Sequence, residues 1–328
     1  MKGWKPSDRG YRLWPGVLLL VAASSASARA DEAGLSFWLP GLQGSFAAVP
    51  TEPGWSFATV YVHPSAEAGA NARFPRGGQV DVGVDGRGNL FAFGPTYTFE
   101  QPLWGGQASL SLLAIAGRNY ASVDATLTGP GGTVSGSRSE AITGFGDLFP
   151  QFTLKWNDGV NNYMTYATGN IPVGSYDPDR LANLGLGHAA VDGGVGYTYL
   201  DPGTGREFSI VGGLTYNFEN PDTDYKSGID SHIDWAASQF VSEQVHVGVV
   251  GYAFHQLTGD SGEGATLGDF RSRVFGIGPQ IGYKFEASDT TDGYVNLKGY
   301  YEFGAKNRAE GWNVWLTLAF SPAAKKPD

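Results

Sequence analysis

Histidines and carboxylates are the residues of this chain whose types and spacing could support catalysis. His232 stands between Asp230 and Asp234, and alternate residues of a strand lie about 7 Å apart on one face. A carboxylate next to an imidazole can orient it as a general base, as in a hydrolase that acts inside a barrel. Because the sequence marks out no accompanying serine, we favour a hydrogen-bond network over a charge relay for this group.

The other motifs for catalysis or metal binding are incomplete. The five histidines show no HxxxH or HExxH spacing, and no GxSxG turn presents a nucleophilic serine. Residues 220–224 (NPDTD) resemble an acidic calcium loop, but the remaining ligands and the bidentate glutamate are missing. We therefore predict that the protein is not an enzyme, and we expect no cofactor and no metal ion.

Polar residues also recur at alternate positions elsewhere, which places them on one face of a strand. On a barrel wall these faces would point into the lumen, either around a water-filled channel or as charge pairs that fill and stiffen the barrel. We favour the second interpretation for most of them. The lumen-facing candidates are Asp147, Gln151, Lys155, Asp230, His232, Asp234, Gln280, Lys284, Asn296, Lys298 and Glu302.

The strands that would carry these faces are clearest near the C-terminus. Residues 292–304 and 311–320 alternate apolar with polar or small side chains, the pattern of a strand with two different faces. In the second segment the apolar face carries Trp312, Leu316 and Phe320. About twelve strand candidates are found in this way, near 56–63, 89–100, 106–127, 139–156, 161–171, 188–200, 206–218, 229–241, 244–257, 271–286, 292–304 and 311–320.

The lengths of the connections favour a transmembrane barrel over a soluble β-sandwich. Short links follow the even-numbered strands, at 102–105, 157–159, 201–205, 242–243 and 288–291. Longer links follow most odd-numbered strands, at 64–88, 128–138, 172–187, 219–228 and 258–270. Short turns at one end, long loops at the other and an even strand number are typical of outer-membrane barrels. We therefore predict an all-β, transmembrane, antiparallel up-and-down β-barrel of about twelve strands over residues 56–320.

The two ends of the chain are expected to differ from the barrel wall. Residues 1–30 have the basic start, short apolar run and Ala28-Arg29-Ala30 site of a cleaved signal peptide. Residues 31–55, rich in glycine, proline and aromatic residues, form an irregular segment and a candidate plug for the lumen. Residues 321–328 would be a tail beyond Phe320, which is the expected assembly signal.

These features predict a location and a set of partners. Sec export and this type of barrel indicate the outer membrane of a Gram-negative bacterium, with its lipid and the barrel-assembly machinery as partners. The formal net charge of −10, and the loss of five basic residues with the signal peptide, exclude nucleic acid as an expected partner. No run approaches the ~20 apolar residues that a spanning helix needs.

Three prolines stand in the apolar register shortly before a turn: Pro95, Pro150 and Pro279, in GPTYTF, FPQFTLKW and GPQIGYKF. Proline removes a ladder donor, and lipid offers no water to satisfy the neighbouring carbonyl. The prolines mark either bulges that curve the wall or weak points at which an apolar solute could leave sideways. We favour bulges, which are common at barrel rims.

Several runs of the sequence resemble a known family. They are the opening FWLPGLQGSFAAVPTEPGW, residues 171–242, GPQIGYKF and the final YVNLKGYYEFGAKNRAEGWNVWLTLAFSP. Together they resemble bacterial outer-membrane barrels described as transporters of the phenol meta-cleavage pathway. The resemblance covers nearly the whole mature chain and implies uptake of hydrophobic or aromatic compounds, but it supplies no set of transport residues.

Pattern and resemblance together predict a passive channel for small apolar or aromatic solutes. Extracellular loops with aromatic residues (Tyr176, Tyr225 and Phe270) would collect the solute, and a polar and aromatic lumen would guide it by diffusion. Two alternatives remain open within the barrel class. One is a structural or adhesive barrel whose loops bind a partner, and the other is a barrel lipid hydrolase.

Overall fold

The computed structural model describes residues 36–74, 78–129, 132–266 and 268–324. The expected signal peptide (1–30), the first residues of the expected plug (31–35) and the last residues of the expected tail (325–328) lie outside the described residues. Within the described ranges, no helix is long and apolar enough to cross a membrane. The described chain forms twelve strands.

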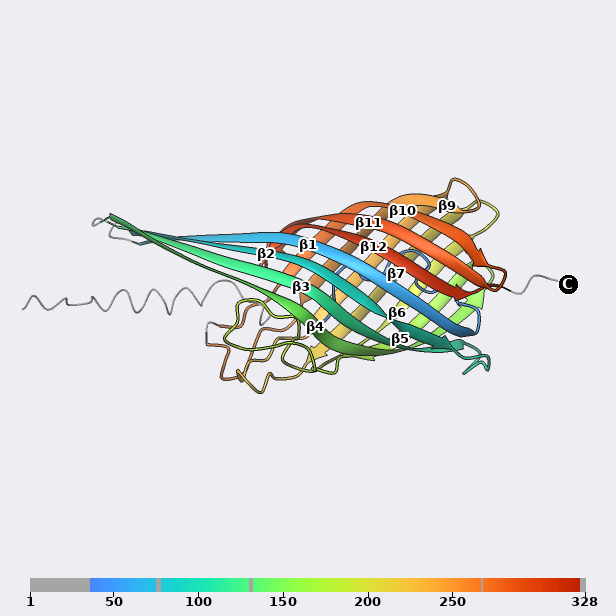
Figure 1. The fold of residues 1–328 in the computed structure, drawn as a ribbon, viewed down its shortest axis with the longest axis horizontal. Helices are drawn as coiled ribbons and strands as arrows, with labels where there is room; N and C mark the ends of the chain where they lie inside the picture. Colours follow the sequence, from blue (N-terminus) through green and yellow to red (C-terminus); the bar gives the residue numbers. More distant parts are fainter. Residues whose placement is uncertain (1–35, 75–77, 130–131, 267, 325–328) are drawn as a thin grey trace, which may run out of the picture.

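These strands close into one antiparallel barrel. Each strand pairs with its neighbours in sequence, and β1 pairs with β12 to complete the wall (Figure 1). The prediction of a twelve-stranded up-and-down barrel is therefore confirmed, and the β-sandwich is excluded. The strands are β1 (Gly54–Phe74), β2 (Gly78–Thr98), β3 (Gln107–Gly129), β4 (Gly132–Asp158), β5 (Asn161–Gly169), β6 (Ala190–Asp201), β7 (Arg206–Asn217), β8 (Asp230–Phe240), β9 (Val245–Gln256), β10 (Arg273–Ser288), β11 (Thr291–Lys306) and β12 (Glu310–Pro322).

Side chains alternate between the two faces of the wall, as the strand period of two requires. On β11, Leu297, Tyr301 and Phe303 are exposed on the outside, whereas Asn296 and Lys298 are buried inside. An outer apolar surface of this extent is the one that outer-membrane barrels present to lipid. Exposed apolar residues on the other strands complete this belt: Phe57, Phe91, Leu110, Leu112, Phe145, Tyr163, Val195, Ile210, Leu214, Ile233, Val249, Ile277, Ile281 and Leu316.

The closing strands meet in an aromatic band at the short-turn end of the barrel. Phe320 on β12 pairs with Phe57 on β1, and its ring meets Phe285 edge-on with 6.3 Å between centroids. Aromatic residues are typical of this interface level, and the assembly role of Phe320 stays a prediction. β12 continues to Pro322, which pairs with Thr291, so the first residues of the expected tail belong to the strand.

The first four strands extend far beyond the others, as a narrowing sheet at the long-loop end (Figure 1). The links predicted at 64–88 and 128–138 are therefore wrong, because most of these residues belong to β1–β4. Ala68, Val84 and Val123 are aligned on one face of this extension. Small and polar residues dominate both faces, so the alternation is too weak to indicate strands from sequence.

Strand pairing is interrupted beside each of the three prolines Pro95, Pro150 and Pro279. The residue pairs before and after each gap keep the same offset, so no residue is inserted there. Beside Pro279, the β10–β11 ladder has no pair between Ile277↔Tyr301 and Gln280↔Lys298. The loss of the proline donor explains one missing hydrogen bond on that strand.

The other two prolines show equivalent gaps. The β2–β3 ladder lacks pairs beside Pro95, and beside Pro150 the β4–β5 ladder gives way to one isolated bridge, Leu148↔Ile171. The register shifts of the barrel lie elsewhere, between Ala114 and Ala116, between Arg273 and Phe275, and between Glu286 and Ser288.

A glycine precedes two of the prolines and allows the neighbouring strand to come very close. A Cβ atom on Gly278 would overlap the carbonyl oxygen of Gly299, and one on Gly94 would overlap the carbonyl oxygen of Leu112. Close backbone approach of this kind requires glycine. The Gly-Pro pairs are therefore points where the wall tolerates no added side chain.

Gly278→Ala should lower the free energy of unfolding of the barrel by roughly 1–3 kcal/mol, because the new methyl group meets a backbone carbonyl that cannot rotate away. Urea unfolding followed by tryptophan fluorescence measures the change. Gly83→Ala is the matched control, since nothing lies within 4 Å of a Cβ at that position. Equal stability of the two variants would contradict the close approach.

Candidate functional site: the filled lumen

Residues 36–53, here called the luminal segment, lie inside the barrel and lead into β1 at its short-turn end. The main chain of this segment is bonded to inward-facing side chains of the wall. Near the short-turn end, the Thr51 N–H donates to Gln107 Oε1 (2.9 Å) and the Ala48 N–H donates to Thr198 Oγ1 (3.1 Å). The segment is thus anchored through its backbone N–H groups, which are present whatever its side chains are.

A turn of the luminal segment is held by two buried charges of opposite sign. Asp234 on β8 accepts the N–H groups of Gly41 (2.9 Å) and Gln43 (3.0 Å). Lys298 on β11 donates to the carbonyl oxygens of Gly41 (2.6 Å), Leu42 (3.3 Å) and Gln43 (3.2 Å). Asp234 is 1% exposed and Lys298 is 5% exposed. Burial of either charge is costly unless strong hydrogen bonds replace water, and the turn supplies those bonds.

Gly41 makes this turn fit against the wall. Its φ of +90° lies in the region that favours glycine, and a Cβ would lie 2.9 Å from the Tyr300 ring and 3.1 Å from the Tyr252 ring. The Tyr300 hydroxyl donates to the Gly41 carbonyl (3.3 Å), and the Tyr252 hydroxyl donates to Glu302 (2.6 Å). Glu302 therefore positions one of the two rings that pack against the turn.

Glu207, at the start of β7, holds the next part of the segment. It is 3% exposed and accepts hydrogen bonds from the Ser45 hydroxyl (2.9 Å) and the Phe46 N–H (3.1 Å). Two hydroxyls of the wall, those of Ser209 and Ser238, donate to the same carboxylate. With four donors around it, this buried charge is fully hydrogen-bonded.

Three further polar side chains of the wall contact the same stretch. Lys155 Nζ donates to a main-chain carbonyl of the segment at 3.1 Å, and Gln280 Nε2 lies 2.8 Å from Ser45 Oγ. Lys284 Nζ lies 4.2 Å from the centroid of the Phe46 ring, a cation–π contact. The wall thus binds both the backbone and the aromatic side chains of the segment.

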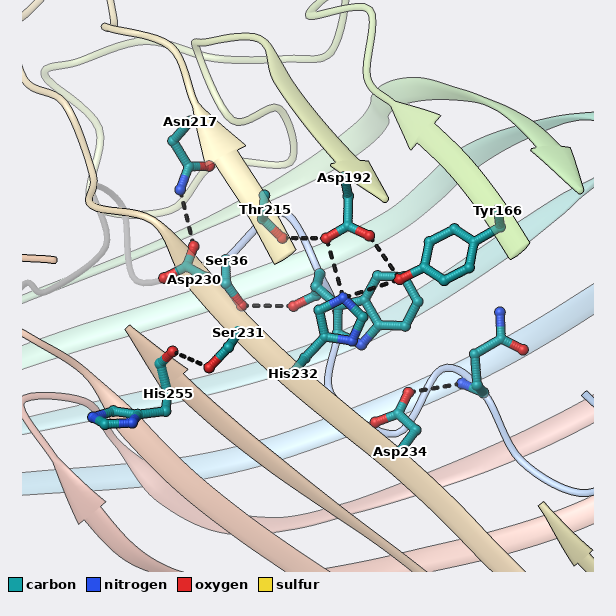
Figure 2. A network of polar contacts seen from close by, with 12 residues as sticks. Ser36, Tyr166, Asp192, Thr215, Asn217, Asp230, Ser231, His232, Asp234 and His255 are labelled. Atoms are coloured by element: carbon teal, nitrogen blue, oxygen red, sulfur yellow. Dashed lines mark hydrogen bonds and ion pairs between the residues drawn. The ribbon is translucent and has the colours of Figure 1, made fainter. Parts of the chain in front are cut away.

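His232 belongs to a buried network at the far end of the segment (Figure 2). Its Nε2 lies 3.1 Å from the Asp192 carboxylate and 3.2 Å from the Tyr166 hydroxyl, which itself donates to Asp192 (2.7 Å). The Thr215 hydroxyl donates to the same carboxylate. The indole of Trp38 stacks on the imidazole, with 3.7 Å between centroids and 13° between planes. His232 therefore joins the wall to the segment.

The carboxylates that flank His232 in sequence are hydrogen-bonded to other groups. Asp234 binds the luminal turn, and Asp230 accepts a hydrogen bond from Asn217 (2.9 Å). Among the described residues, no serine hydroxyl is hydrogen-bonded to His232, and no group of three or more His, Cys, Asp or Glu side chains could hold a metal ion. The arrangement around His232 is a buried hydrogen-bond network with Asp192, Tyr166 and Thr215.

Two apolar clusters also line the lumen. Leu39 and Leu42 of the luminal segment pack against the first of them, and Leu42 also packs against the second, which contains Trp38 of the segment with Met164 and Val211 of the wall. The luminal segment is thus held by apolar contacts as well as by polar ones. The first cluster consists of Val62, Leu90, Leu184, Ala236, Val250, Tyr252, Phe254, Val274, Tyr300 and Trp315.

Asp147 binds the long loop between β5 and β6 to the inside of the wall. Its carboxylate accepts hydrogen bonds from Asn170 Nδ2 (2.7 Å), the Gly174 N–H (2.9 Å) and the Leu186 N–H (3.2 Å). The same loop contributes Leu184 to the first apolar cluster. The loop therefore packs into the barrel and adds to the filling of the lumen.

All eleven lumen-facing candidates lie on the inner face, but their contacts differ. Asp147 binds the β5–β6 loop, Asn296 donates to Gln280 (3.4 Å), and Gln151 lies opposite Ser111 of β3. Asp230 and Glu302 bond to wall residues. The six that contact the luminal segment are Lys155, His232, Asp234, Gln280, Lys284 and Lys298.

The sequence analysis missed three residues of the site: Glu207, Asp192 and Tyr166. Each stands between outward-facing residues of its strand, so the strand period alone indicates that its side chain points inward. Glu207 directly precedes Phe208, for example. Each of them, however, is the lone charged or phenolic group on the inner face of its strand, and single polar residues are weak signals.

A closed barrel with a lipid-facing belt and a filled lumen defines the class of outer-membrane β-barrels. The chain belongs to the family described as "Putative MetA-pathway of phenol degradation", which it matches over residues 70–318. The resemblance seen in the sequence is therefore confirmed.

Solved structures agree on the fold. An outer membrane channel from Pseudomonas putida superposes with a TM-score of 0.61 at 15% identity, covering 84% of this chain and 96% of that one. A FadL homologue from Pseudomonas aeruginosa reaches a TM-score of 0.35 at 6% identity, covering 82% and 88%, and adds no support. A comparison with the curated proteins finds no match.

Lys298→Met should loosen the luminal segment, because three carbonyl oxygens lose a charged donor whose hydrogen bonds contribute about 1.5–3 kcal/mol each. Limited proteolysis with mass spectrometry would show faster cleavage within residues 36–53. Arg87→Met removes an equal charge from the exposed extension and should leave this cleavage unchanged. Wild-type cleavage rates in Lys298→Met would contradict the role of the charged clamp.

Proposed function

We propose that the protein is a passive channel of the outer membrane for small hydrophobic or aromatic compounds, with the luminal segment as its gate. The observation that carries this proposal is that the inside of the barrel already binds aromatic rings, those of the segment itself. Trp38 stacks on His232, Phe37 lies 5.7 Å from the Phe149 ring, and Phe46 lies next to Lys284.

A free aromatic solute can make the same contacts as these rings. Ring stacking and cation–π contacts contribute roughly 0.5–2 kcal/mol each in protected sites. Solute and segment therefore compete for the same ring positions, and an aromatic solute replaces the ring contacts that the segment loses when it moves. A sugar has no aromatic ring, so it replaces neither the ring stacking nor the cation–π contact.

Two comparisons support this function. The description of the family refers to phenol degradation, which agrees with an aromatic solute. The Pseudomonas putida protein with the same fold is an outer membrane channel. Sec export, insertion by the barrel-assembly machinery through Phe320, and contact with outer-membrane lipid belong to the same proposal, since the apolar belt requires a bilayer.

Liposomes that contain the wild-type protein should admit a small aromatic solute several times faster than a sugar of similar size. Deletion of residues 36–49 should raise the rate for both solutes and remove the preference, because the gate is lost. Stopped-flow light scattering measures the swelling rate. Equal wild-type rates for both solutes, or no swelling with either protein, would contradict the proposal.

The same vesicles separate the two alternatives. A barrel lipid hydrolase would release fatty acid from the vesicle lipid, and this release would fall in His232→Ala. A structural or adhesive barrel would give no flux even after the deletion, whereas loss of its long loops would abolish binding to its partner. Channel activity without fatty-acid release supports the proposed function.

The gaps beside the prolines provide a candidate path from the lumen sideways into the membrane. The chain has no cysteine, so Pro279→Cys with Gly299→Cys would place one disulfide across the unpaired positions of β10 and β11. If aromatic solutes leave through the gap beside Pro279, oxidation should lower their flux at least several-fold. Ile281→Cys with Leu297→Cys, at an existing pair, is the control. Unchanged flux in both oxidised variants would show that the solute passes along the barrel axis and not through the wall.

A further inference from the structure

A row of three exposed basic residues, the cations Arg273 and Lys306 with His255 beside them, crosses adjacent strands at the long-loop rim. Arg273 of β10 pairs with His255 of β9 on one side and with Lys306 of β11 on the other. Directly paired residues point to the same side of a sheet, and all three are exposed on the outer face. These strands lie next to one another in the wall (Figure 1). The row is therefore one continuous basic strip.

This basic strip lies at the edge of the apolar belt. The next outward-facing residues along β10 and β11 are Phe275 and Phe303, whose rings stack with 5.8 Å between centroids. Further along the same strands, Ile277 and Tyr301 are 45% and 69% exposed. A cation directly beyond such residues is placed where lipid headgroups meet the acyl chains.

The charges of the strip are not neutralised within the protein. In the described part of the chain, none of His255, Arg273 and Lys306 has a carboxylate within 4.0 Å. Three other exposed arginines do have one: Arg87 is paired with Asp85, Arg138 with Glu140 and Arg180 with Asp177. Arg118 and Arg206 are exposed and have none, but they do not form a row across neighbouring strands.

Acidic residues are abundant in this chain, whose formal net charge is −10. Two of them lie close to the strip in sequence. Glu310 accepts the Ala305 N–H (2.9 Å), and Asp269 lines the hollow beside the strip but, among the described residues, forms no ion pair with Arg273 or Lys306. Unpaired cations on an acidic protein, at a lipid boundary, are complementary to an anion supplied by the membrane.

A shallow hollow adjoins the strip and provides room for a headgroup. It has a volume of about 370 Å³ and is lined by Gly268, Asp269, Phe270, Arg271, Lys306 and Asn307, so one carboxylate faces two cations there. The Asn307 amide donates to the Arg271 carbonyl (2.9 Å) and ties the two sides of the hollow together. Arg271 is also exposed and adds a third cation to Arg273 and Lys306.

We infer that this strip binds the phosphate groups of the outer-leaflet glycolipid, lipopolysaccharide. Guanidinium and ammonium groups are the protein donors best suited to phosphate oxygens. The spacing across neighbouring strands, about 4.8 Å, allows two side chains to contact one phosphate. Binding would fix β9–β11 in the outer leaflet, and it does not depend on what the channel transports.

The test uses the full-length barrel in detergent and bisphosphorylated lipid A as the probe. Arg273→Gln with Lys306→Gln should weaken binding about tenfold or more, since each lost contact to a charged oxygen corresponds to roughly that factor. Arg87→Gln with Arg138→Gln removes the same charge from exposed, ion-paired positions and should bind like the wild type. Native mass spectrometry measures the bound fraction, and an unchanged heat-modifiable band shows that each variant is folded.

Dephosphorylated lipid A should bind wild-type protein as weakly as bisphosphorylated lipid A binds the double variant. Equal binding of both lipids, or unchanged binding by the Arg273→Gln, Lys306→Gln variant, would overturn the inference. Inorganic phosphate is added as a competitor at millimolar concentration. Displacement of lipid A by free phosphate would identify a soluble-anion site and would also overturn the assignment to lipid.

Discussion

The luminal turn at residues 41–43 and the two charges that bind it are the interaction on which the rest of the site depends. Asp234 and Lys298 are buried in a protein wall whose outer side faces lipid, so neither can be solvated from outside. Each is satisfied by main-chain groups of the turn. Without the turn both charges would be left buried and poorly bonded, and without the charges the turn would have no strong anchor.

This mutual dependence extends along the whole segment. Strands β6–β8 supply carboxylates and hydroxyls that bind the segment's N–H groups, as Glu207 and Thr198 do. Strands β10 and β11 supply donors, as Gln280 and Lys298 do. Between these polar groups two apolar clusters pack against the segment, and Leu42 contacts both of them. The proposed gate is therefore positioned by polar and apolar contacts around the whole lumen.

The architecture also suggests why charged residues are tolerated inside this barrel. A filled lumen with stiffening charge pairs and an open polar lumen were the two interpretations of the inward charges. The structure shows a third arrangement, in which many of these charges bind a segment of the same chain rather than one another. Lys298, for example, contacts three carbonyl oxygens, and no carboxylate of the described residues lies within 4.0 Å of its ammonium group. In the proposed function, charges used in this way hold the gate through hydrogen bonds that a passing solute can break.

Sequence patterns predicted the wall well and the contacts inside it poorly. The alternation of Asn296, Lys298 and Glu302 with Leu297, Tyr301 and Phe303 fixed both faces of β11, because the strand period is a local property. Partners across the lumen are not local. His232 contacts Asp192, which is 40 positions away on another strand, and no pattern around either residue indicates this pairing.

The long extension of β1–β4 was also missed, for a different physical reason. Outside the lipid belt neither face of a sheet needs large apolar residues, so Ala68 and Val84 do not stand out against their polar neighbours. The luminal segment was a candidate plug on composition alone. Its anchoring could not be predicted, because it is made mostly by backbone groups, which every residue carries.

A reversible tether between the luminal segment and the wall tests the account most directly. Ser45 Oγ and Ser238 Oγ lie 3.4 Å apart, so Ser45→Cys with Ser238→Cys would form a disulfide in a chain that otherwise has no cysteine. The measurement is the flux of an aromatic solute into the same proteoliposomes before and after reduction. If the segment is the gate, flux is absent in the oxidised protein and returns to the wild-type rate on reduction. Equal flux in both states would show that solutes pass while the segment stays in place, which contradicts the account.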